Sequence, residues 1–225
     1  EKRAITKCAI KSERAAMVNR VNGTAGSVVD PATRRAHSLT GGYVDYLRAN
    51  VEEGLALVDV AVDAEDYCLD LAELSADLRA RPSEDKRKVD VHDCKEMPTR
   101  LARQNIRLAS CLAVVLNRPA VDHEVLRIVR KVALDTAAGH SLSVVQWLCA
   151  PNPRADNRPY QECGGHTVQA LESWTGMTPE RLQRYLTFLR KIGVLEWRAV
   201  NQSYGAWLLT ERVYDLYRRV MGGLL

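Results

Sequence analysis

The residues with the clearest chemical potential are the basic side chains near the carboxyl end of the chain. The 225 residues include 32 Lys and Arg against 28 Asp and Glu, a formal net charge of +4. Residues 178–225 hold eight of the basic and four of the acidic residues, so this segment carries the whole excess of positive charge. A local concentration of Lys and Arg is the electrostatic pattern of a surface that binds a polyanion.

Two short helices joined by a turn are predicted to position these side chains. The first covers residues 167–174, and the turn is Thr175-Gly176-Met177. Thr178 is a favoured N-cap and Pro179 suits the first helical position, so a second helix is predicted from residue 180 to 192, ending at Gly193. Its predicted buried stripe is Leu182, Tyr185, Leu186, Leu189 and Ile192. This arrangement is a helix-turn-helix unit.

The apolar period then changes from helical to two. Residues 194–200 and 206–210 are predicted strands, residues 201–205 the turn between them, and residues 211–221 a last helix. The segment TGMTPERLQRYLTFLRKIGVLEWRAVNQSYGAWLLT, within residues 141–222, resembles the winged-helix DNA-binding domains of replication and transcription proteins.

This resemblance implies DNA binding through the second helix and the hairpin, or wing. In that family the recognition helix enters the major groove and the wing often touches the backbone or minor groove. The implied contacts are Arg181, Gln183, Arg184 and Thr187 to bases and phosphates, Arg190 and Lys191 to phosphates, and Arg198, Asn201, Gln202 and Tyr204 from the wing. Winged helices also dock proteins and exposed arginines are common on helices, so a docking role stays open.

The remaining chain is predicted to be a helical bundle. Helices are expected at 2–21, 43–61, 64–81, 99–116, 122–138 and 141–149, with a linker at 22–42 that holds one helical turn at Asp30-Pro31. A charged loop is expected at 83–97 and a polar loop at 151–166. The predicted fold class is mainly α: a helical bundle followed by a winged helix-turn-helix with a two-stranded β-hairpin. The predicted domains are 1–42, 43–140 and 141–225.

Residues 97–138 are similar to the helical region that follows the ATPase core of minichromosome-maintenance-like and of phage or plasmid replicative helicases. That similarity implies that Arg100 or Arg103 senses a nucleotide held by an ATPase domain in the same polypeptide. This chain has no GxxxxGK[ST] loop and no Ser/His/Asp or paired-carboxylate constellation, so no catalytic residue, enzyme activity or cofactor is predicted for it. Because it begins at Glu1 in a helix-like segment, we expect a fragment of a longer protein.

The cysteines indicate the compartment. Six cysteines are scattered singly, unlike a secreted disulfide scaffold, and no apolar run approaches the roughly 20 residues of a membrane span, so a cytoplasmic protein without a membrane partner is expected. His92, Cys94, Cys163 and His166 form a weak zinc pattern, and the favoured prediction is no metal.

Three functions follow from these patterns. The first is DNA binding by a C-terminal fragment of a replication initiation or helicase protein of a bacterium, phage or mobile element, on duplex or forked DNA. The second is a transcriptional regulator that binds a duplex operator as a homo-oligomer. The third is protein docking without DNA.

Overall fold

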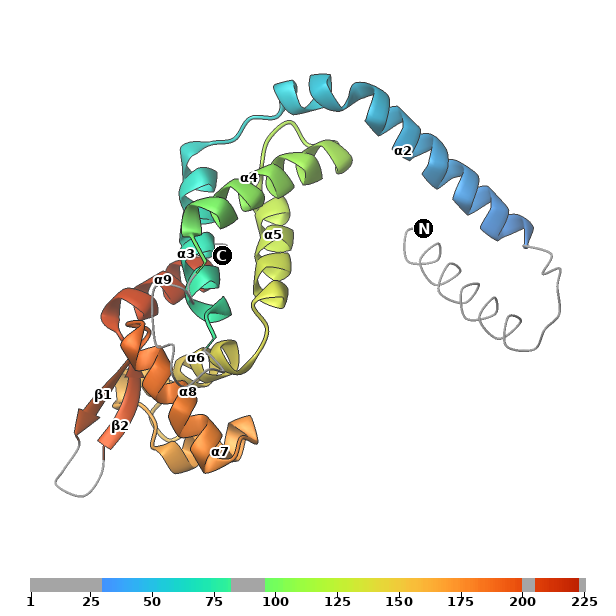
Figure 1. Cartoon of the computed structure of the whole chain (residues 1–225). Coiled ribbons are helices and arrows are strands. Elements are labelled where there is room, and N and C mark those ends of the chain that lie inside the picture. Colours follow the sequence, from blue (N-terminus) through green and yellow to red (C-terminus); the bar gives the residue numbers. More distant parts are fainter. Residues whose placement is uncertain (1–29, 82–95, 200–204, 223–225) are drawn as a thin grey trace. The chain divides into compact units, whose positions relative to one another are not determined.

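The computed structural model of the chain describes residues 30–81, 96–199 and 205–222 (Figure 1). It is mainly helical, with one small antiparallel sheet near the carboxyl end, which confirms the predicted mainly α class. The chain divides into two compact units, Glu1–Ala56 and Leu57–Leu225. The predicted domain limits at residues 42 and 140 do not coincide with the boundary between these units, and they stay predictions.

The described part of the first unit lies almost entirely in one long helix, α2 (Pro31–Leu57), whose last residue opens the second unit. The prediction of a linker through residue 42 is therefore wrong for residues 31–42. Glycines at 41 and 42 resemble a linker, yet each costs a helix only about 1 kcal/mol relative to alanine, which does not forbid helical backbone. The predicted helix at 2–21 lies outside the described residues.

The second unit begins with four helices close to their predicted positions: α3 (Val62–Arg79), α4 (Pro98–Val115), α5 (His123–Thr136) and α6 (His140–Cys149). The Asp122 side chain accepts a 3.0 Å hydrogen bond from the Val125 amide, as an N-cap does. Leu71, Leu74 and Leu78 of α3 are fully buried in a core that α4, α5 and α6 share. Most of the predicted charged loop, at 82–95, is not among the residues described.

The carboxyl-terminal elements follow in the predicted order. They are the 3-10 helix η2 (Tyr160–Cys163), α7 (Val168–Thr175), α8 (Pro179–Lys191), β1 (Leu195–Ala199), β2 (Gly205–Leu209) and α9 (Glu211–Gly222). β1 and β2 are antiparallel, with Leu195 opposite Leu209. Their buried residues join the same core as those of α3 to α6, so the core is continuous across residue 140.

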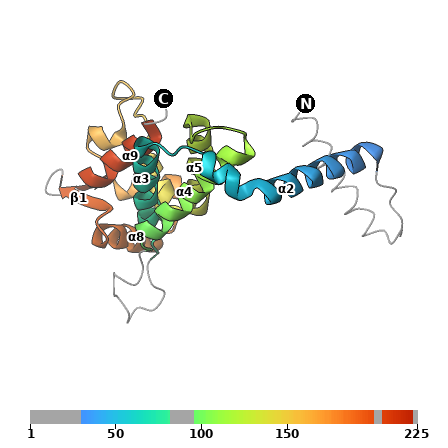
Figure 2. The ribbon, with the colours of Figure 1, turned by 90° about the horizontal axis from the view of Figure 1, so that it is seen from above.

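Helix α9 is anchored along α3, beside which it runs in Figures 1 and 2. The Arg212 guanidinium lies 2.7 Å from the buried Asp77 carboxylate, and Arg219 makes two hydrogen bonds, of 2.7 and 3.1 Å, to Asp70. The Tyr67 hydroxyl donates to the Val220 carbonyl at 3.0 Å. Arg130 of α5 donates to the carbonyls of residues 220 and 221, so the last turn of α9 is capped by side chains of the bundle.

The glycines of α2 allow a direct test of the helix that replaces the predicted linker. A Cβ at Gly41 or Gly42 meets no atom within 4 Å, so Gly41→Ala and Gly42→Ala should each stabilise α2 by roughly 0.5–1 kcal/mol. The measurement is native-state hydrogen exchange of residues 31–57. The matched control is Gly193→Ala, which should destabilise the second unit by about 1 kcal/mol because Gly193 has φ +75°. Loss of exchange protection in Gly41→Ala would contradict the helix.

The Arg212–Asp77 pair should be a main determinant of how α9 docks. Arg212→Ala removes the guanidinium that lies 2.7 Å from a buried carboxylate, so we expect a loss of roughly 2–3 kcal/mol of unfolding free energy in urea. Arg218→Ala is the matched control on the same helix, with an expected loss below about 1 kcal/mol because Arg218 is exposed over the Tyr214 ring. Equal effects of the two substitutions would show that the Arg212–Asp77 pair has no special role.

Candidate nucleic-acid interface

Helix α8 is fixed by an apolar face and by its two ends. Thr178 occupies the N-cap position without a side-chain capping bond, Pro179 is the first helical residue, and Gly193 follows the C-cap with φ +75°. The buried residues are Leu182, Leu186, Phe188 and Leu189. The predicted stripe is therefore corrected at three positions: Tyr185 and Ile192 are only half-buried, and Phe188, which was not predicted, belongs to the core.

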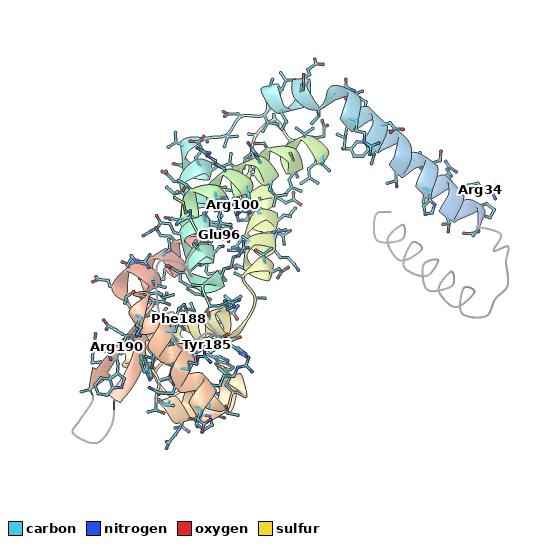
Figure 3. All side chains as sticks on the ribbon, in the orientation of Figure 1. Arg34, Glu96, Arg100, Tyr185, Phe188 and Arg190 are labelled. Atoms are coloured by element: carbon cyan, nitrogen blue, oxygen red, sulfur yellow. The ribbon has the colours of Figure 1, made fainter. Side chains whose placement is uncertain are left out.

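The exposed face of α8 holds all six residues predicted there for DNA contact. Arg181, Gln183, Arg184, Thr187, Arg190 and Lys191 are all exposed. Among the described residues, Arg181, Arg190 and Lys191 form no ion pair. Figure 3 marks Arg190 and Tyr185 on different sides of α8. The helix therefore presents a polar, cationic side to solvent and an apolar side to the core.

The positive side of α8 extends to the start of α6. The His140 ring meets the Tyr185 ring edge-on, with centroids 5.3 Å apart. Burial, and then the charges of Arg181 and Arg81, lower the pKa of His140 below its ordinary value. Arg81 itself donates to the carbonyl of Leu78 at 2.6 Å, so it is held at the carboxyl end of α3. Two guanidinium groups thus raise the electrostatic potential around His140.

The hairpin carries less free charge than the sequence indicated. Arg198 is exposed, but its guanidinium lies 2.9 Å from the Glu196 carboxylate. The predicted contacts Asn201, Gln202 and Tyr204 lie outside the described residues. Trp197 is 44% exposed, and a Cβ on Gly205 would overlap its ring. The strand pattern places Trp197 opposite Trp207, but nothing in the sequence marks it as the exposed one of the two.

The excess positive charge of residues 178–225 is partly used inside the fold. Arg212 and Arg219 are paired with carboxylates of α3, and Arg198 is paired with its neighbour in β1. Arg218 lies over Tyr214, 5.7 Å from the ring centroid. The basic residues that remain for an external anion are therefore mainly those of α8.

The predicted polar loop at 151–166 is ordered against β2. The amide side chain of Gln161 accepts from the Leu209 N–H and donates to the Leu209 carbonyl, at 2.7 and 2.9 Å. His166 and Trp207 exchange two backbone hydrogen bonds, of 3.0 and 2.8 Å. These pairings attach the segment before α7 to the hairpin, which the sequence did not predict.

An aromatic cluster behind this loop was also missed. The rings of Trp147 and Trp174 stack with centroids 4.3 Å apart, and His166 lies 3.9 Å from Tyr160 and 4.3 Å from Trp174. His166 is 6% exposed, and within the described chain its Nε2 atom has no hydrogen-bond partner. The members come from four separate positions in the sequence, so no local pattern could have identified them.

The two arginines predicted to sense a nucleotide lie at the start of α4. Arg100 is 71% exposed and 3.8 Å from Glu96, which also pairs with Arg79 at 3.2 Å (Figure 3). Arg103 is exposed on the same helix. Their role toward an ATPase domain stays a prediction.

The predicted zinc pattern lies only partly within the described residues. Those residues contain no group of three or more His, Cys, Asp or Glu side chains that could hold a metal ion. His92 and Cys94 are not among them, whereas Cys163 is exposed and His166 is buried. None of the described helices has the length and apolar character needed to cross a bilayer.

The buried His166 predicts a pH dependence. Burial lowers the pKa of His166 to about 4, against about 6.5 in an unfolded chain, so the unfolded state binds more protons between these values. The free energy of unfolding is therefore unaffected by His166 above pH 6.5. It falls by up to about 3 kcal/mol as the pH falls toward 4. In the His166→Gln variant, the free energy of unfolding measured in urea should depend less on pH over this range. An unchanged pH profile in the variant would contradict the assignment.

Comparison with known proteins adds no relative. No protein-family model, no curated protein and no solved structure matches the chain.

Proposed function

We propose that α6 to α9, with the β1–β2 hairpin, form a winged helix that binds DNA through α8. The single observation that carries this proposal is the exposed side of α8, with four basic residues, two hydrogen-bonding polar residues and one acid, Glu180. The predicted resemblance to winged-helix domains and the order of the elements support it. A DNA major groove is wide enough for one α-helix, and phosphates supply most of the binding free energy.

The side chains of α8 suit different parts of a duplex. Arg184 and Gln183 carry planar groups that can make paired hydrogen bonds, Arg to guanine and Gln to adenine. Arg190 and Lys191, at the carboxyl end of α8, suit phosphate contacts. Arg198 and the exposed Trp197 give the hairpin a second contact to the backbone or minor groove, together with Gln202 and Tyr204.

The proposed cellular role is replication initiation or helicase function, with this chain as the carboxyl-terminal part of a longer protein. The similarity of residues 97–138 to the region after a replicative ATPase core supports this role. In that setting Arg100 and Arg103 would face a nucleotide bound by the ATPase domain.

A second function, protein docking, is favoured by one observation. Trp197 exposes 44% of its surface on the hairpin, and exposed tryptophans are common anchors of protein interfaces. A winged helix used this way would contact its partner through the hairpin rather than through α8.

Charge reversal on α8 tests DNA binding. We expect Arg190→Glu/Lys191→Glu to weaken binding to a fluorescent duplex at least about tenfold, and to reduce the slope of log affinity against log salt by about 2. The measurement is fluorescence anisotropy over a salt series, with circular dichroism to confirm folding. The matched control is Arg103→Glu/Arg107→Glu, which makes the same charge change on the exposed side of α4. This variant should keep most of the wild-type affinity for the duplex.

The outcomes separate the proposals. Equal losses in the two double variants would mean nonspecific attraction by net charge, and no DNA binding by the wild type would favour docking. Replication proteins should bind forked or single-stranded DNA with little sequence preference, whereas a regulator should bind a palindromic duplex as a dimer.

A further inference from the structure

Helix α2 is divided along its length into an apolar half and a charged half. With about 100° between successive residues, its large apolar side chains fall on one half of the surface, namely Leu39, Tyr43, Val44, Tyr46, Leu47, Val51, Leu55 and Leu57. All six charged residues of the helix fall on the other half: Arg34, Arg35, Asp45, Arg48, Glu52 and Glu53. The apolar half is exposed, with Leu39 64% and Tyr46 61% accessible.

This helix has little intrinsic stability of its own. Gly41, Gly42 and Gly54 disfavour helical backbone, and β-branched Val44 and Val51 do so more weakly. Isolated helices of poor propensity are marginal in water, so packing of an apolar face normally supplies their stability. The exposed half of α2 therefore requires a covering partner.

The centre of the apolar half follows a coiled-coil spacing. Intervals of four and three residues alternate through Ala36, Thr40, Tyr43, Leu47, Asn50, Gly54 and Leu57. Tyr43, Leu47 and Leu57 are its large apolar members, and the small or polar residues between them let a second helix approach closely. We therefore expect this stripe to pack on another helix.

The charges identify that helix as a second, antiparallel copy of α2. Arg34 and Arg35 lie near the amino end and Glu52 and Glu53 near the carboxyl end, in each case 18 residues or five turns apart, so Arg35 and Glu53 share one flank of the helix. In a twofold antiparallel pair, the same flanks of the two copies face each other. In a parallel pair opposite flanks face each other, so Arg35 and Glu53 of the two copies would not be brought together.

The helix dipole gives the same orientation. Positive side chains near the amino end and negative ones near the carboxyl end oppose the macrodipole of a single α2, whose first turn has no acid and whose last turn has no base. In an antiparallel pair each end lies beside the opposite end of its partner, so the unfavourable placement is compensated.

We infer that α2 pairs with α2 of a second copy of this chain to form an antiparallel, twofold-symmetric dimer. With the twofold axis at residue 45, Tyr43 faces Leu47 of the other copy, Thr40 faces Asn50, and Ala36 faces Gly54, so small residues meet where the backbones must approach closely. Arg35 and Glu53 of the other copy lie within two residues of direct opposition, about 3 Å along the axis. The charged half carries three basic and three acidic residues, so it has no net attraction to an anionic membrane.

Sedimentation equilibrium of the full chain, from roughly 1 to 100 µM, tests this inference. We expect a mass of twice 25.2 kDa at the higher concentrations, and monomers for Leu47→Lys. Ala49→Lys adds the same side chain to the charged half and is the matched control, with dimerisation unchanged. Arg35→Glu and Glu53→Arg should each weaken the dimer about tenfold, and the combined variant should return to within about threefold of the wild type.

Each other outcome overturns the inference. A monomer at all concentrations means that the face is covered within the chain, and a dimer insensitive to Leu47→Lys lies elsewhere. No recovery in the combined Arg35→Glu/Glu53→Arg variant excludes antiparallel pairing. Binding of the monomer to vesicles containing anionic lipid identifies a membrane surface instead. The readout is mass, so it is independent of whether α8 binds DNA.

Discussion

The carboxylate of Asp77 is the constraint on which the arrangement of the second unit depends. It is buried in α3, where a charge without a cation would be costly, and the cation comes from Arg212 at the start of α9, 135 residues later. The hairpin immediately precedes α9, and Leu195 and Leu209 of its two strands are buried in the common core. Docking α9 on α3 therefore fixes the base of the hairpin, and β1 in turn follows directly from α8.

This anchoring changes the meaning of the charge distribution. In the sequence, eight basic residues after position 177 form one positive segment. In the structure, Arg212 and Arg219 pair with carboxylates of the bundle and Arg198 pairs with Glu196, so the charges of these three are partly compensated within the chain. A segment charge of +4 therefore does not describe one surface. The residues that can act on an external anion are concentrated on α8, which makes the proposed interface narrower than the sequence indicated.

Local features were predictable and distant contacts were not. Asp122 as a cap, Pro179 as a first helical residue and Gly193 as a helix end act within a few residues, and the structure has helix boundaries at all three. The same local logic failed at Gly41-Gly42, because two glycines lower the stability of a helix by about 1 kcal/mol each without forbidding helical backbone. The pairings of Gln161 with Leu209 and of His166 with Trp207 join residues more than 40 positions apart, so no local sequence window contains them.

The position of the charges along α8 distinguishes those that stabilise the helix from those that do not. Arg190 and Lys191 lie in the last turn, where the helix dipole is negative, so they would be favourable even without a ligand. Arg181 lies in the first turn, near the positive end, and adds to the charge of Arg81 around His140. Cations placed against the local field lower stability unless an anion compensates them. Arg181, rather than the more conspicuous pair at the end of the helix, is therefore the cation of α8 whose position the helix dipole does not favour.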